Sequence, residues 1–392
     1  MSSSHVSATA GCDQRVAGGR LTIDLDALAA NYRLLAEHST PAEPAAVVKA
    51  DAYGLGTAPV VRALAAAGCR RFFVALPEEG VAVRRAAPEA EIYVFNGLFG
   101  PEAAAFYREA RLLPVLNSQS DLSIWEAHGW DDGDEPRPCA LHVETGMNRL
   151  GLTPDRTRIL AQENALTGAL TPRMVISHLA CADTPDHPMN RQQLKSFQLL
   201  SSLFPDAESS LANSAGIFLG GAFLCDATRS GIALYGGAPV NGVENPMRPV
   251  VTAETRVSQL RQVPAGQSVS YGATPVARDT LVAVAATGYA DGYHRAASGA
   301  GVPLRRSVPE GAAGFIAGHR VPVLGRVTMD LTLFDVTALR PDAVKVGDYI
   351  ELFGRNMPID EVAAAAGTIA YELLTALGRR YHRHYVQSGA SA

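Results

Sequence analysis

Between residues 45 and 236, short apolar runs alternate with longer segments in which apolar residues recur with helical period. This alternation constrains the fold strongly, because continuous apolar strands between helices are typical of a parallel sheet covered on both faces. Eight such units predict a (β/α)8 barrel, with a doubly wound open sheet as the alternative. The predicted strands are Ala45–Ala50, Arg71–Leu76, Glu91–Gly97, Leu112–Ser118, Ala140–Gly146, Met174–Ala180, Ser210–Ala215 and Ala227–Gly236.

The pattern changes after the eighth strand, where shorter alternating strands are separated by turns rich in proline and glycine. We therefore predict an α/β protein with a barrel over residues 20–248 and a mostly β domain over residues 249–388. Residues 1–19 are rich in Ser, Ala and Gly, so we expect a disordered N-terminal extension. One helix is expected near the end of the chain, between an N-cap at Asp360 and Gly378.

Composition excludes several classes of function. A formal net charge of -5 over 392 residues gives no electrostatic reason to expect a nucleic-acid or anionic-membrane partner. No uninterrupted apolar stretch approaches the ~20 residues that a membrane-spanning helix needs. The 5 cysteines show no Cys-x-x-Cys pair, which argues against a metal site or a disulfide framework. The N-terminal segment lacks the apolar run of a signal peptide, so we expect a cytoplasmic protein.

Polar residues capable of chemistry stand at or just beyond the predicted ends of several strands, and in a barrel these ends converge on one mouth. Taken singly, each has an ordinary explanation, such as a lysine that reaches solvent or a histidine satisfied in the core. Their recurrence at equivalent ends of successive strands favours a functional site. These residues are Lys49, His142, Glu144, Arg149, His178, Asn213, Ser214, Arg229, Gly231 and Ile232.

Lys49 follows the apolar run Ala45–Val48, where a charged ammonium is costly unless it is paired or neutralised. A partly desolvated lysine near cations has a lowered pKa, and its free amine can attack a carbonyl. One interpretation is a Schiff base with pyridoxal phosphate, which also needs a phosphate-binding turn and a group facing its ring nitrogen. A lysine-dependent aldolase is the other interpretation.

A series of segments resembles, in the same order, the motifs of the alanine racemase family of pyridoxal-phosphate enzymes. The segments are VVKADAYGLG, ETGMNRLG, SHLACAD, ANSAG, RSGIALYG, SYGAT, GYADGY, GRVTMD and IAYE. The resemblance runs from about residue 20 to about residue 385. It implies a (β/α)8 barrel followed by a β domain, and a homodimer whose active sites are completed by the partner's second domain. The implied reaction interconverts L-alanine and D-alanine and supplies D-alanine for peptidoglycan.

The resemblance implies two acid–base residues. Lys49 would hold the cofactor as an aldimine and then act as the base on one face of the substrate Cα. Tyr271 of the other subunit would act on the opposite face. Racemisation needs this arrangement, because one group removes the α-proton and another returns a proton from the other side.

The other implied roles divide between cofactor and substrate. Arg229 would face the pyridine nitrogen, where a guanidinium can only donate, and His178 would lie behind it. Arg149 would contact the cofactor phenolate and the substrate carboxylate. The backbone N–H of Met329 would add a second carboxylate donor, and Tyr289 would line the entry to the site. The residues implied for the cofactor phosphate are Tyr53, Ser214, Gly231, Ile232 and Tyr371.

Two positions depart from the family pattern. Many members have a carbamylated lysine seven residues before the arginine aligned with Arg149, and this anion orients the arginine; here the position is His142. Imidazole cannot form the same stable carboxylate, so His142 itself, Glu144 or a bound anion such as chloride must take its place. Ser210 stands where some members have a histidine, so the relay behind Arg229 is expected to be shorter.

Other functions fit parts of the sequence. A racemase for serine or a broader range of amino acids would need the same residues, because a methyl-sized difference in a pocket is worth only ~1–3 kcal/mol. A cofactor carrier without turnover would not need a second domain with Tyr271 and Met329. A decarboxylase would favour an acidic residue where Arg229 stands. A metal-assisted lyase would need a His/Asp cluster in the second domain, for which His382–His384 is a poor candidate.

Overall fold

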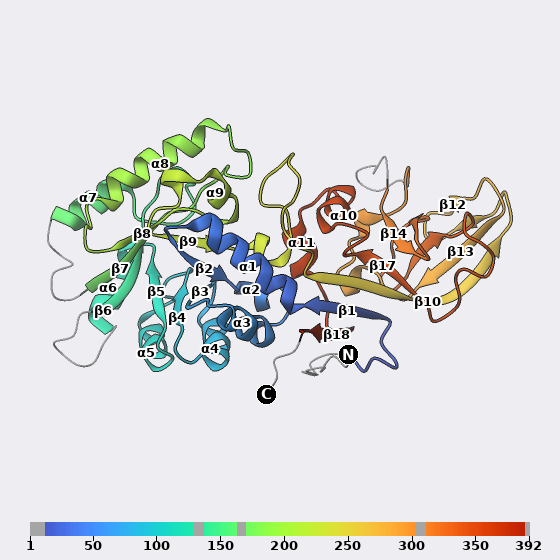
Figure 1. The fold of residues 1–392 in the computed structure, drawn as a ribbon, viewed down its shortest axis with the longest axis horizontal. Coiled ribbons are helices and arrows are strands. Elements are labelled where there is room, and N and C mark those ends of the chain that lie inside the picture. The colour runs from blue at the N-terminus through green and yellow to red at the C-terminus, as the bar shows by residue number, and fades with distance from the viewer. Residues whose placement is uncertain (1–11, 129–136, 163–169, 303–310, 389–392) are drawn as a thin grey trace. The chain divides into compact units, whose positions relative to one another are not determined.

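A computed structural model gives the fold of the chain (Figure 1). It divides into two compact units, here named the barrel unit, Leu28–Met247, and the β unit, which contains the chain up to Ala27 and from Arg248 onward. The structure confirms the predicted barrel followed by a mostly β domain. The residues that it describes are 12–128, 137–162, 170–302 and 311–388.

The barrel unit is built on eight parallel strands. They are β2 (Glu43–Val47), β3 (Arg71–Val74), β4 (Glu91–Val94), β5 (Leu113–Leu116), β6 (Arg137–His142), β7 (Leu170–Ile176), β8 (Glu208–Ser210) and β9 (Ala227–Ser230). Their order is β8-β7-β6-β5-β4-β3-β2-β9. Two hydrogen bonds connect β8 and β9, the strands at the two ends of this order. Asp226 N–H donates to Ser209 O at 3.0 Å, and Arg229 N–H donates to Ala212 O at 2.9 Å. These bonds bring β8 beside β9 and close the sheet.

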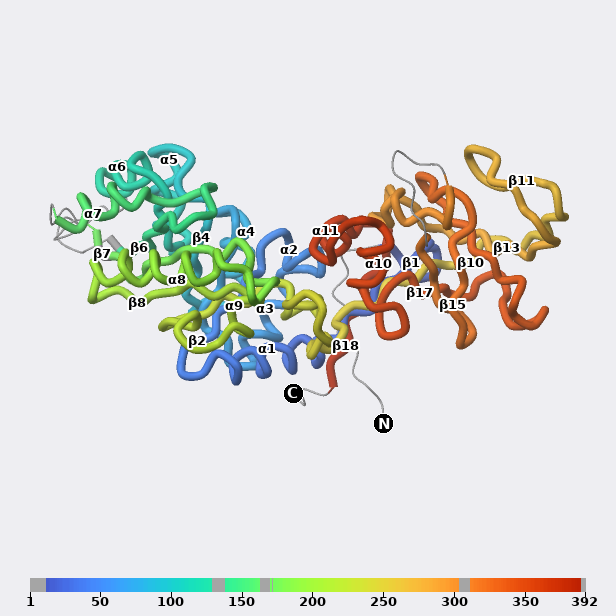
Figure 2. The backbone as a smooth tube through the Cα atoms, turned by 90° about the horizontal axis from the view of Figure 1, so that it is seen from above, coloured from blue at the N-terminus to red at the C-terminus, as the bar shows by residue number. Residues whose placement is uncertain are grey.

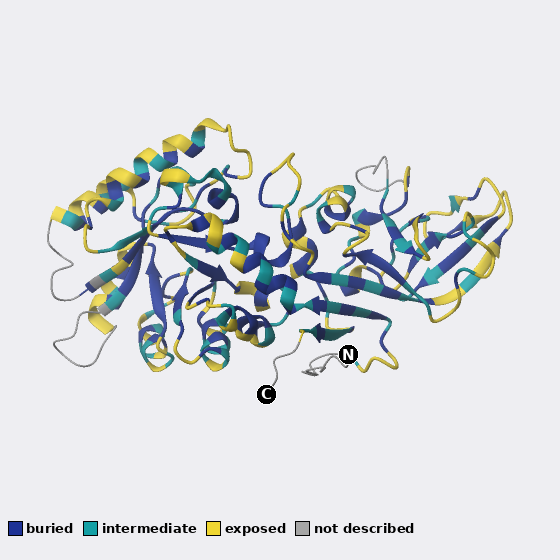
Figure 3. Cartoon of the chain, in the orientation of Figure 1, coloured by how far each residue is buried: buried dark blue, intermediate teal, exposed yellow. Residues whose placement is uncertain are grey.

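Helices cover the outside of this sheet, with their apolar sides buried and their outer sides exposed (Figures 1, 2 and 3). In α3, for example, Val60, Val61 and Leu64 are buried at helical spacing. The helices are α1 (Leu25–Ser39), α2 (Lys49–Tyr53), α3 (Thr57–Ala66), α4 (Pro77–Ala86), α5 (Pro101–Glu109), α6 (Gln119–His128), α7 (Pro154–Gln162), α8 (Pro188–Ser201) and α9 (Ser214–Leu219), with 3-10 turns η1 (Gly221–Phe223) and η2 (Ile232–Tyr235).

Arg71 ties together the amino-terminal ends of four barrel strands. Its side chain is only 9% exposed and lies 2.7 Å from Glu91, 2.8 Å from Glu208 and 3.7 Å from Glu43. Each of these residues begins its strand. Burial lowers the pKa of Arg71, but the hydrogen bond and charge of Glu91, together with Tyr93 and Glu208, raise it overall. The cluster therefore joins strands at the end of the barrel opposite to the predicted site.

Replacing Arg71 with methionine should lower the free energy of unfolding by about 2–3 kcal/mol, because a largely buried donor to several carboxylates is lost. The measurement is urea unfolding followed by circular dichroism. Arg173→Met is the matched control, since Arg173 pairs with the same Glu91 at 3.2 Å but is 55% exposed. That control should cost less than about 1 kcal/mol. Equal losses in the two variants would refute the structural role given to Arg71.

The β unit is built around one large sheet. Its strands are β1 (Gly19–Asp24), β10 (Val251–Val263), β11 (Ser268–Val269), β12 (Thr274–Pro275), β13 (Thr280–Ala285), β14 (Ala313–Ile316), β15 (His319–Pro322), β16 (Thr332–Asp335), β17 (Tyr349–Phe353) and β18 (Tyr381–Val386). The main order is β15-β14-β17-β10-β1-β18, and β13 pairs with β10 and β16. β11 and β12 form a separate short hairpin. Two further 3-10 turns are η3 (Tyr289–Asp291) and η4 (Arg295–Ala297).

The structure moves the start of the barrel unit. The sequence placed residues 20–248 in the barrel, but β1 pairs antiparallel with β10 and parallel with β18 in the sheet of the β unit. Leu21 and Ile23 are fully buried there. The predicted extension over residues 1–19 also reaches too far, because Gly19 already belongs to β1. Residues 12–18, which precede β1, are described by the structure, whereas residues 1–11 lie outside the described residues.

The single helix expected between Asp360 and Gly378 is two helices, α10 (Ile359–Ala365) and α11 (Ala370–Thr375). Gly367 separates them with a φ of 67°, a left-handed conformation that glycine adopts without strain. The first helix follows Pro358 rather than an Asp360 cap. Across the described part of the chain, no helix has both the length and the apolar character needed to cross a membrane.

Candidate active site

The chain leaves β2 through a left-handed turn that begins just after Lys49. Ala50, Asp51 and Ala52 have φ of 54°, 53° and 52°, and Tyr53 has φ of 56°. The N–H of Ala52 donates to Val48 O at 3.0 Å, four residues back, as in a helix of opposite hand. Left-handed geometry costs roughly 1–2 kcal/mol for each residue other than glycine. Strain of this kind persists only where surrounding structure enforces it, and it is frequent at functional sites.

Two carboxylates hold this turn. Asp51 Oδ1 accepts from the N–H and the hydroxyl of Thr57 at 2.7 and 2.9 Å. Glu79, in α4, accepts from Ala50 N–H at 2.7 Å and from Ala75 N–H at 2.8 Å. The end of β3 and the turn after β2 are therefore joined by one side chain, and Lys49 is presented next to this junction.

Replacing Ala50 with glycine should raise the free energy of unfolding by about 0.5–1 kcal/mol, because glycine adopts positive φ without steric cost. Ala82→Gly in the right-handed helix α4 is the control and should lower it by about 1 kcal/mol. Both are measured by urea unfolding. Destabilisation of the Ala50 variant would mean that the turn is not strained as described.

Lys49 stands two residues beyond β2, not within the buried strand as predicted. Burial ends at Val48, and the Lys49 side chain is reached by solvent at the strand end. The surrounding protein nevertheless lowers the pKa of Lys49, first by desolvation and then through the positive charge of Arg149. Its Nζ lies 6.0 Å from the centre of the Phe95 ring. The amine is thus more available as a nucleophile than an ordinary surface lysine.

The left-handed turn after Lys49 brings the Tyr53 hydroxyl close to Ser214 and Gly231. Tyr53 stacks on Tyr235 with ring centres 4.4 Å apart, and a Cβ at Gly231 would lie 2.6 Å from the Tyr53 hydroxyl. Ser214, the first residue of α9, accepts from Gly231 N–H at 2.8 Å and from Ala233 N–H at 3.3 Å. Ile232 begins the η2 turn between these two amides. Hydroxyls and closely spaced backbone N–H groups of this kind suit an anionic group.

Arg229 is a buried cation with one unused donor. It is 2% exposed, and its Nη1 donates to the carbonyl and hydroxyl of Ser210 at 2.7 and 2.5 Å, while Nη2 donates to Ser177 O. Its buried Nε has no hydrogen-bond partner among the described residues. Burial lowers the pKa of Arg229 to about 10, so it remains charged at neutral pH. A ligand with an acceptor nitrogen would satisfy the Nε.

Two histidines near this cation are neutral. Burial, with the charge of Arg229 as the next cause, lowers the pKa of His178 to about 3 and that of His142 to about 4. Arg149 adds to both effects, which places its charge near the same mouth. The Glu144 carboxylate accepts from Gly146 N–H and from Asn148 N–H at 2.8 Å, which fixes it within its own loop. The residues predicted at the barrel strand ends therefore share one mouth.

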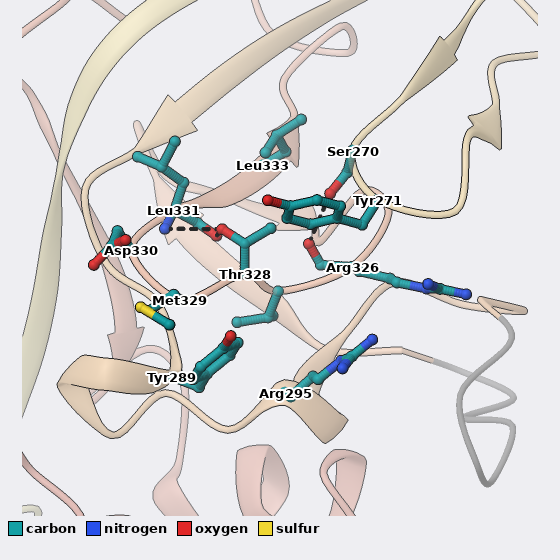
Figure 4. A pocket seen from close by; sticks show the side chains of 11 residues that line it. Ser270, Tyr271, Tyr289, Arg295, Arg326, Thr328, Met329, Asp330, Leu331 and Leu333 are labelled. Atoms are coloured by element: carbon teal, nitrogen blue, oxygen red, sulfur yellow. Dashed lines mark hydrogen bonds between the residues drawn. The ribbon is translucent and has the colours of Figure 1, made fainter.

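The predicted second-domain residues include three that line a hollow of the β unit. Tyr271 is at the tip of the β11–β12 hairpin and is 72% exposed, and Tyr289 and Met329 lie across from it (Figure 4). Glycine is favoured at position 272, beside Tyr271, because its φ of 83° is a left-handed conformation that other residues adopt only with strain. The hollow has a volume of about 800 Å³. It presents aromatic and apolar side chains that this unit alone does not cover.

Tyr371, the last of the predicted site residues, lies in α11 of the β unit and is exposed. Sequence reasoning missed Glu79 and Asn117, although each follows a predicted strand that carried no other site candidate. Applying the strand-end criterion to the second and fourth runs would have found them. Within the described ranges, no group of three or more His, Cys, Asp or Glu side chains is placed to hold a metal ion.

Comparison with known proteins gives one consistent result. Residues 23–239 match the family described as "Alanine racemase, N-terminal domain" and residues 250–385 match "Alanine racemase, C-terminal domain". A protein of Rhizobium meliloti (strain 1021) named "Alanine racemase" is 54% identical over 371 residues, which cover 94% of this chain and 97% of that protein. "Alanine racemase, biosynthetic" of Agrobacterium fabrum is 54% identical, with 94% and 93% covered.

A solved structure extends the likeness to the fold. It is described as alanine racemase from Bartonella henselae with covalently bound pyridoxal phosphate. The two chains superpose with a TM-score of 0.86 at 36% sequence identity, over 94% of this chain and 100% of that one.

Proposed function

The chain belongs to the alanine racemase family, and on that ground we propose that it interconverts L-alanine and D-alanine with pyridoxal phosphate as cofactor. The product D-alanine would serve peptidoglycan synthesis. The observation that carries the proposal is the mouth of the barrel unit, where β2 pairs with β9 and the charges of Lys49, Arg149 and Arg229 all act on His178. Of the Tyr53–Ser214–Gly231 group, Tyr53 follows β2, Gly231 follows β9 and Ser214 follows β8. The cysteines are all free thiols, which suits action in the cytoplasm.

The residues present fit this cofactor. The unsatisfied Nε of Arg229 suits an acceptor on the pyridine ring, and the cradle at Gly231, which a Cβ would fill, suits a phosphate. Lys49 offers the amine for covalent attachment, and Arg149 offers a donor to the phenolate oxygen. When bound, pyridoxal phosphate supplies an electron sink for negative charge that develops at the substrate Cα. The residues proposed for its phosphate are Tyr53, Ser214, Gly231, Ile232 and Tyr371.

Two groups would move the α-proton. Lys49 acts as the base on one face of the substrate Cα, and the partner subunit's Tyr271 acts on the other face. In either direction, one of the two groups removes the α-proton and the other delivers a proton to the opposite face, so that the configuration inverts. The exposure of Tyr271, Tyr289 and Met329 around one hollow supports a homodimer, because contiguous exposed apolar surface commonly marks an interface.

Arg149 and Arg229 would set binding and selectivity. The Arg149 guanidinium and the backbone N–H of the partner subunit's Met329 hold the substrate carboxylate, so that the Cα–H bond stays directed at the two bases. Arg229 keeps its proton and donates to the ring nitrogen, and His178 lies behind it as a neutral neighbour. A ring nitrogen that only accepts a hydrogen bond is a weaker electron sink than a protonated one. This limits side reactions such as transamination.

The experiment is incubation of the purified protein and added pyridoxal phosphate with L-alanine, D-alanine or L-serine, followed by chiral chromatography. We expect both alanine enantiomers to approach an equal mixture and serine to react more slowly. Faster turnover of serine would favour the alternative, a racemase of serine or broader specificity. Absence of inversion with every amino acid would refute the proposed function.

A further inference from the structure

We propose that a neutral pair of side chains, Asn117 and His142, orients Arg149. Asn117 fixes the tautomer of His142, and His142 Nε2 accepts a hydrogen bond from the Arg149 guanidinium. This inference rests on the proposed function, in which Arg149 binds the cofactor phenolate and the substrate carboxylate. It identifies which group takes the place of the carbamylated lysine that the family resemblance implies at the position of His142. No bound anion is required.

Asn117 is held in one orientation. It follows β5, and its backbone N–H donates to Asp121 Oδ2 at 2.9 Å. Its side-chain Nδ2 donates to Phe95 O at 2.8 Å and to Val115 O at 3.0 Å. Carbonyl oxygens only accept hydrogen bonds, so the NH2 group of the amide must face both of them. The Oδ1 atom is therefore left to face His142.

This orientation determines the proton on His142. The Nδ1 of His142 lies 2.8 Å from Asn117 Oδ1, and both residues are buried. Because an amide oxygen cannot donate, Nδ1 must carry the proton. Burial keeps the ring neutral, since it lowers the pKa of His142 to about 4. A neutral ring protonated at Nδ1 has a free lone pair at Nε2.

The Cδ2 edge of the ring, adjacent to Nε2, lies against the loop that carries Arg149. His142 Cδ2, the carbon bonded to Nε2, lies 3.2 Å from the position of a Cβ at Gly151, where φ is 115°. The loop returns to the end of β6, because Leu152 N–H donates to His142 O at 2.7 Å. Glu144, the other candidate in this loop, is engaged by the N–H groups of Gly146 and Asn148. The charge of Arg149 contributes to the lowered pKa of His142, so the two side chains are near each other, and we assign the Nε2 lone pair as the acceptor for Arg149.

A matched pair of substitutions separates this role from simple packing. Glutamine at position 142 places an amide oxygen near the Nε2 position, whereas asparagine reaches only the Nδ1 position and keeps a partner for Asn117. We expect His142→Asn to raise KM for L-alanine about tenfold or more with a smaller change in kcat, and His142→Gln to stay close to wild type. Thermal unfolding of both variants serves as the structural control. Equal KM values in the two folded variants would overturn the proposal.

The tautomer itself can be measured without turnover or cofactor. A long-range proton–nitrogen correlation spectrum of wild-type protein with 15N-labelled histidine should show His142 protonated on Nδ1 alone at neutral pH. Protonation on Nε2, or on both nitrogens, would overturn the proposal even if racemase activity is present. Conversely, the expected tautomer in a protein without racemase activity would leave the Asn117–His142 pair in place and refute the proposed function only.

Chloride provides the remaining test. The wild-type KM for L-alanine, measured in sodium chloride and in sodium gluconate at the same ionic strength, should be unchanged. A KM that falls steeply with chloride would show that a bound anion orients Arg149, and would overturn the proposal.

Discussion

Lys49→Ala should abolish racemisation and covalent cofactor binding together. The variant loses both the amine that attaches pyridoxal phosphate and one of the two acid–base groups, so the rate should fall by at least about 10³-fold. The bound cofactor's visible absorption band should disappear after dialysis. Borohydride should no longer fix the cofactor to the protein, as judged by mass spectrometry.

Lys195→Ala is the matched control for this prediction. Lys195 is an exposed lysine of α8, so its loss removes the same charge from the same unit without touching the mouth of the barrel. It should keep wild-type activity and the bound cofactor. A Lys49→Ala protein that retained covalently attached cofactor would show that another amine carries it, and the site would be assigned wrongly.

Tyr271→Phe should lower racemisation by about 10²–10⁴-fold in both directions while cofactor binding stays intact. The hydroxyl is the proposed acid–base group on the second face, and phenylalanine preserves the ring. Because Lys49 remains, one enantiomer should still exchange its α-proton with solvent without inverting. Tyr289→Phe, on the same hollow, removes a hydroxyl with no proposed proton transfer and should cost much less.

Mixed dimers test whether each site draws on both subunits. Lys49→Ala protomers and Tyr271→Phe protomers are each expected to be inactive alone, and mixing them forms hybrid dimers. If Tyr271 acts in the partner's site, one of the two sites in each hybrid keeps both a native Lys49 and a native Tyr271. Random pairing makes half of the dimers hybrids, so about a quarter of wild-type activity should return. If both groups came from one subunit, every site would lack one of them and no activity would return.

The sequence predicts the barrel well, because its strands are local apolar runs. Each of the eight predicted runs overlaps an observed strand, and four of them contain the whole strand, although the seventh run shares only Ser210 with β8. The strand-end rule also selects Lys49, His142 and Arg229, whose charges or rings all act on His178. β1 was assigned to the wrong unit for a physical reason. Its six residues alternate like any half-buried strand, and only pairing with β10 and β18, more than 200 residues away, decides its sheet.

The conformation of the site was harder to predict than its composition. The positive φ angles after Lys49 occur at alanine, aspartate and tyrosine, which give no local signal for a left-handed turn. They depend on Glu79 and Asp51, whose hydrogen bonds form only in the folded barrel. The tautomer of His142 likewise depends on Asn117, which is 25 residues away in sequence.

The central claim, two-base racemisation of alanine, is tested most directly by proton NMR of L-alanine in deuterated water with the purified protein and pyridoxal phosphate. Chiral chromatography of the same samples follows the appearance of D-alanine. We predict loss of the α-proton signal together with inversion to an equal mixture of enantiomers. Exchange without inversion would contradict the second base, and absence of both exchange and inversion would contradict the claim as a whole.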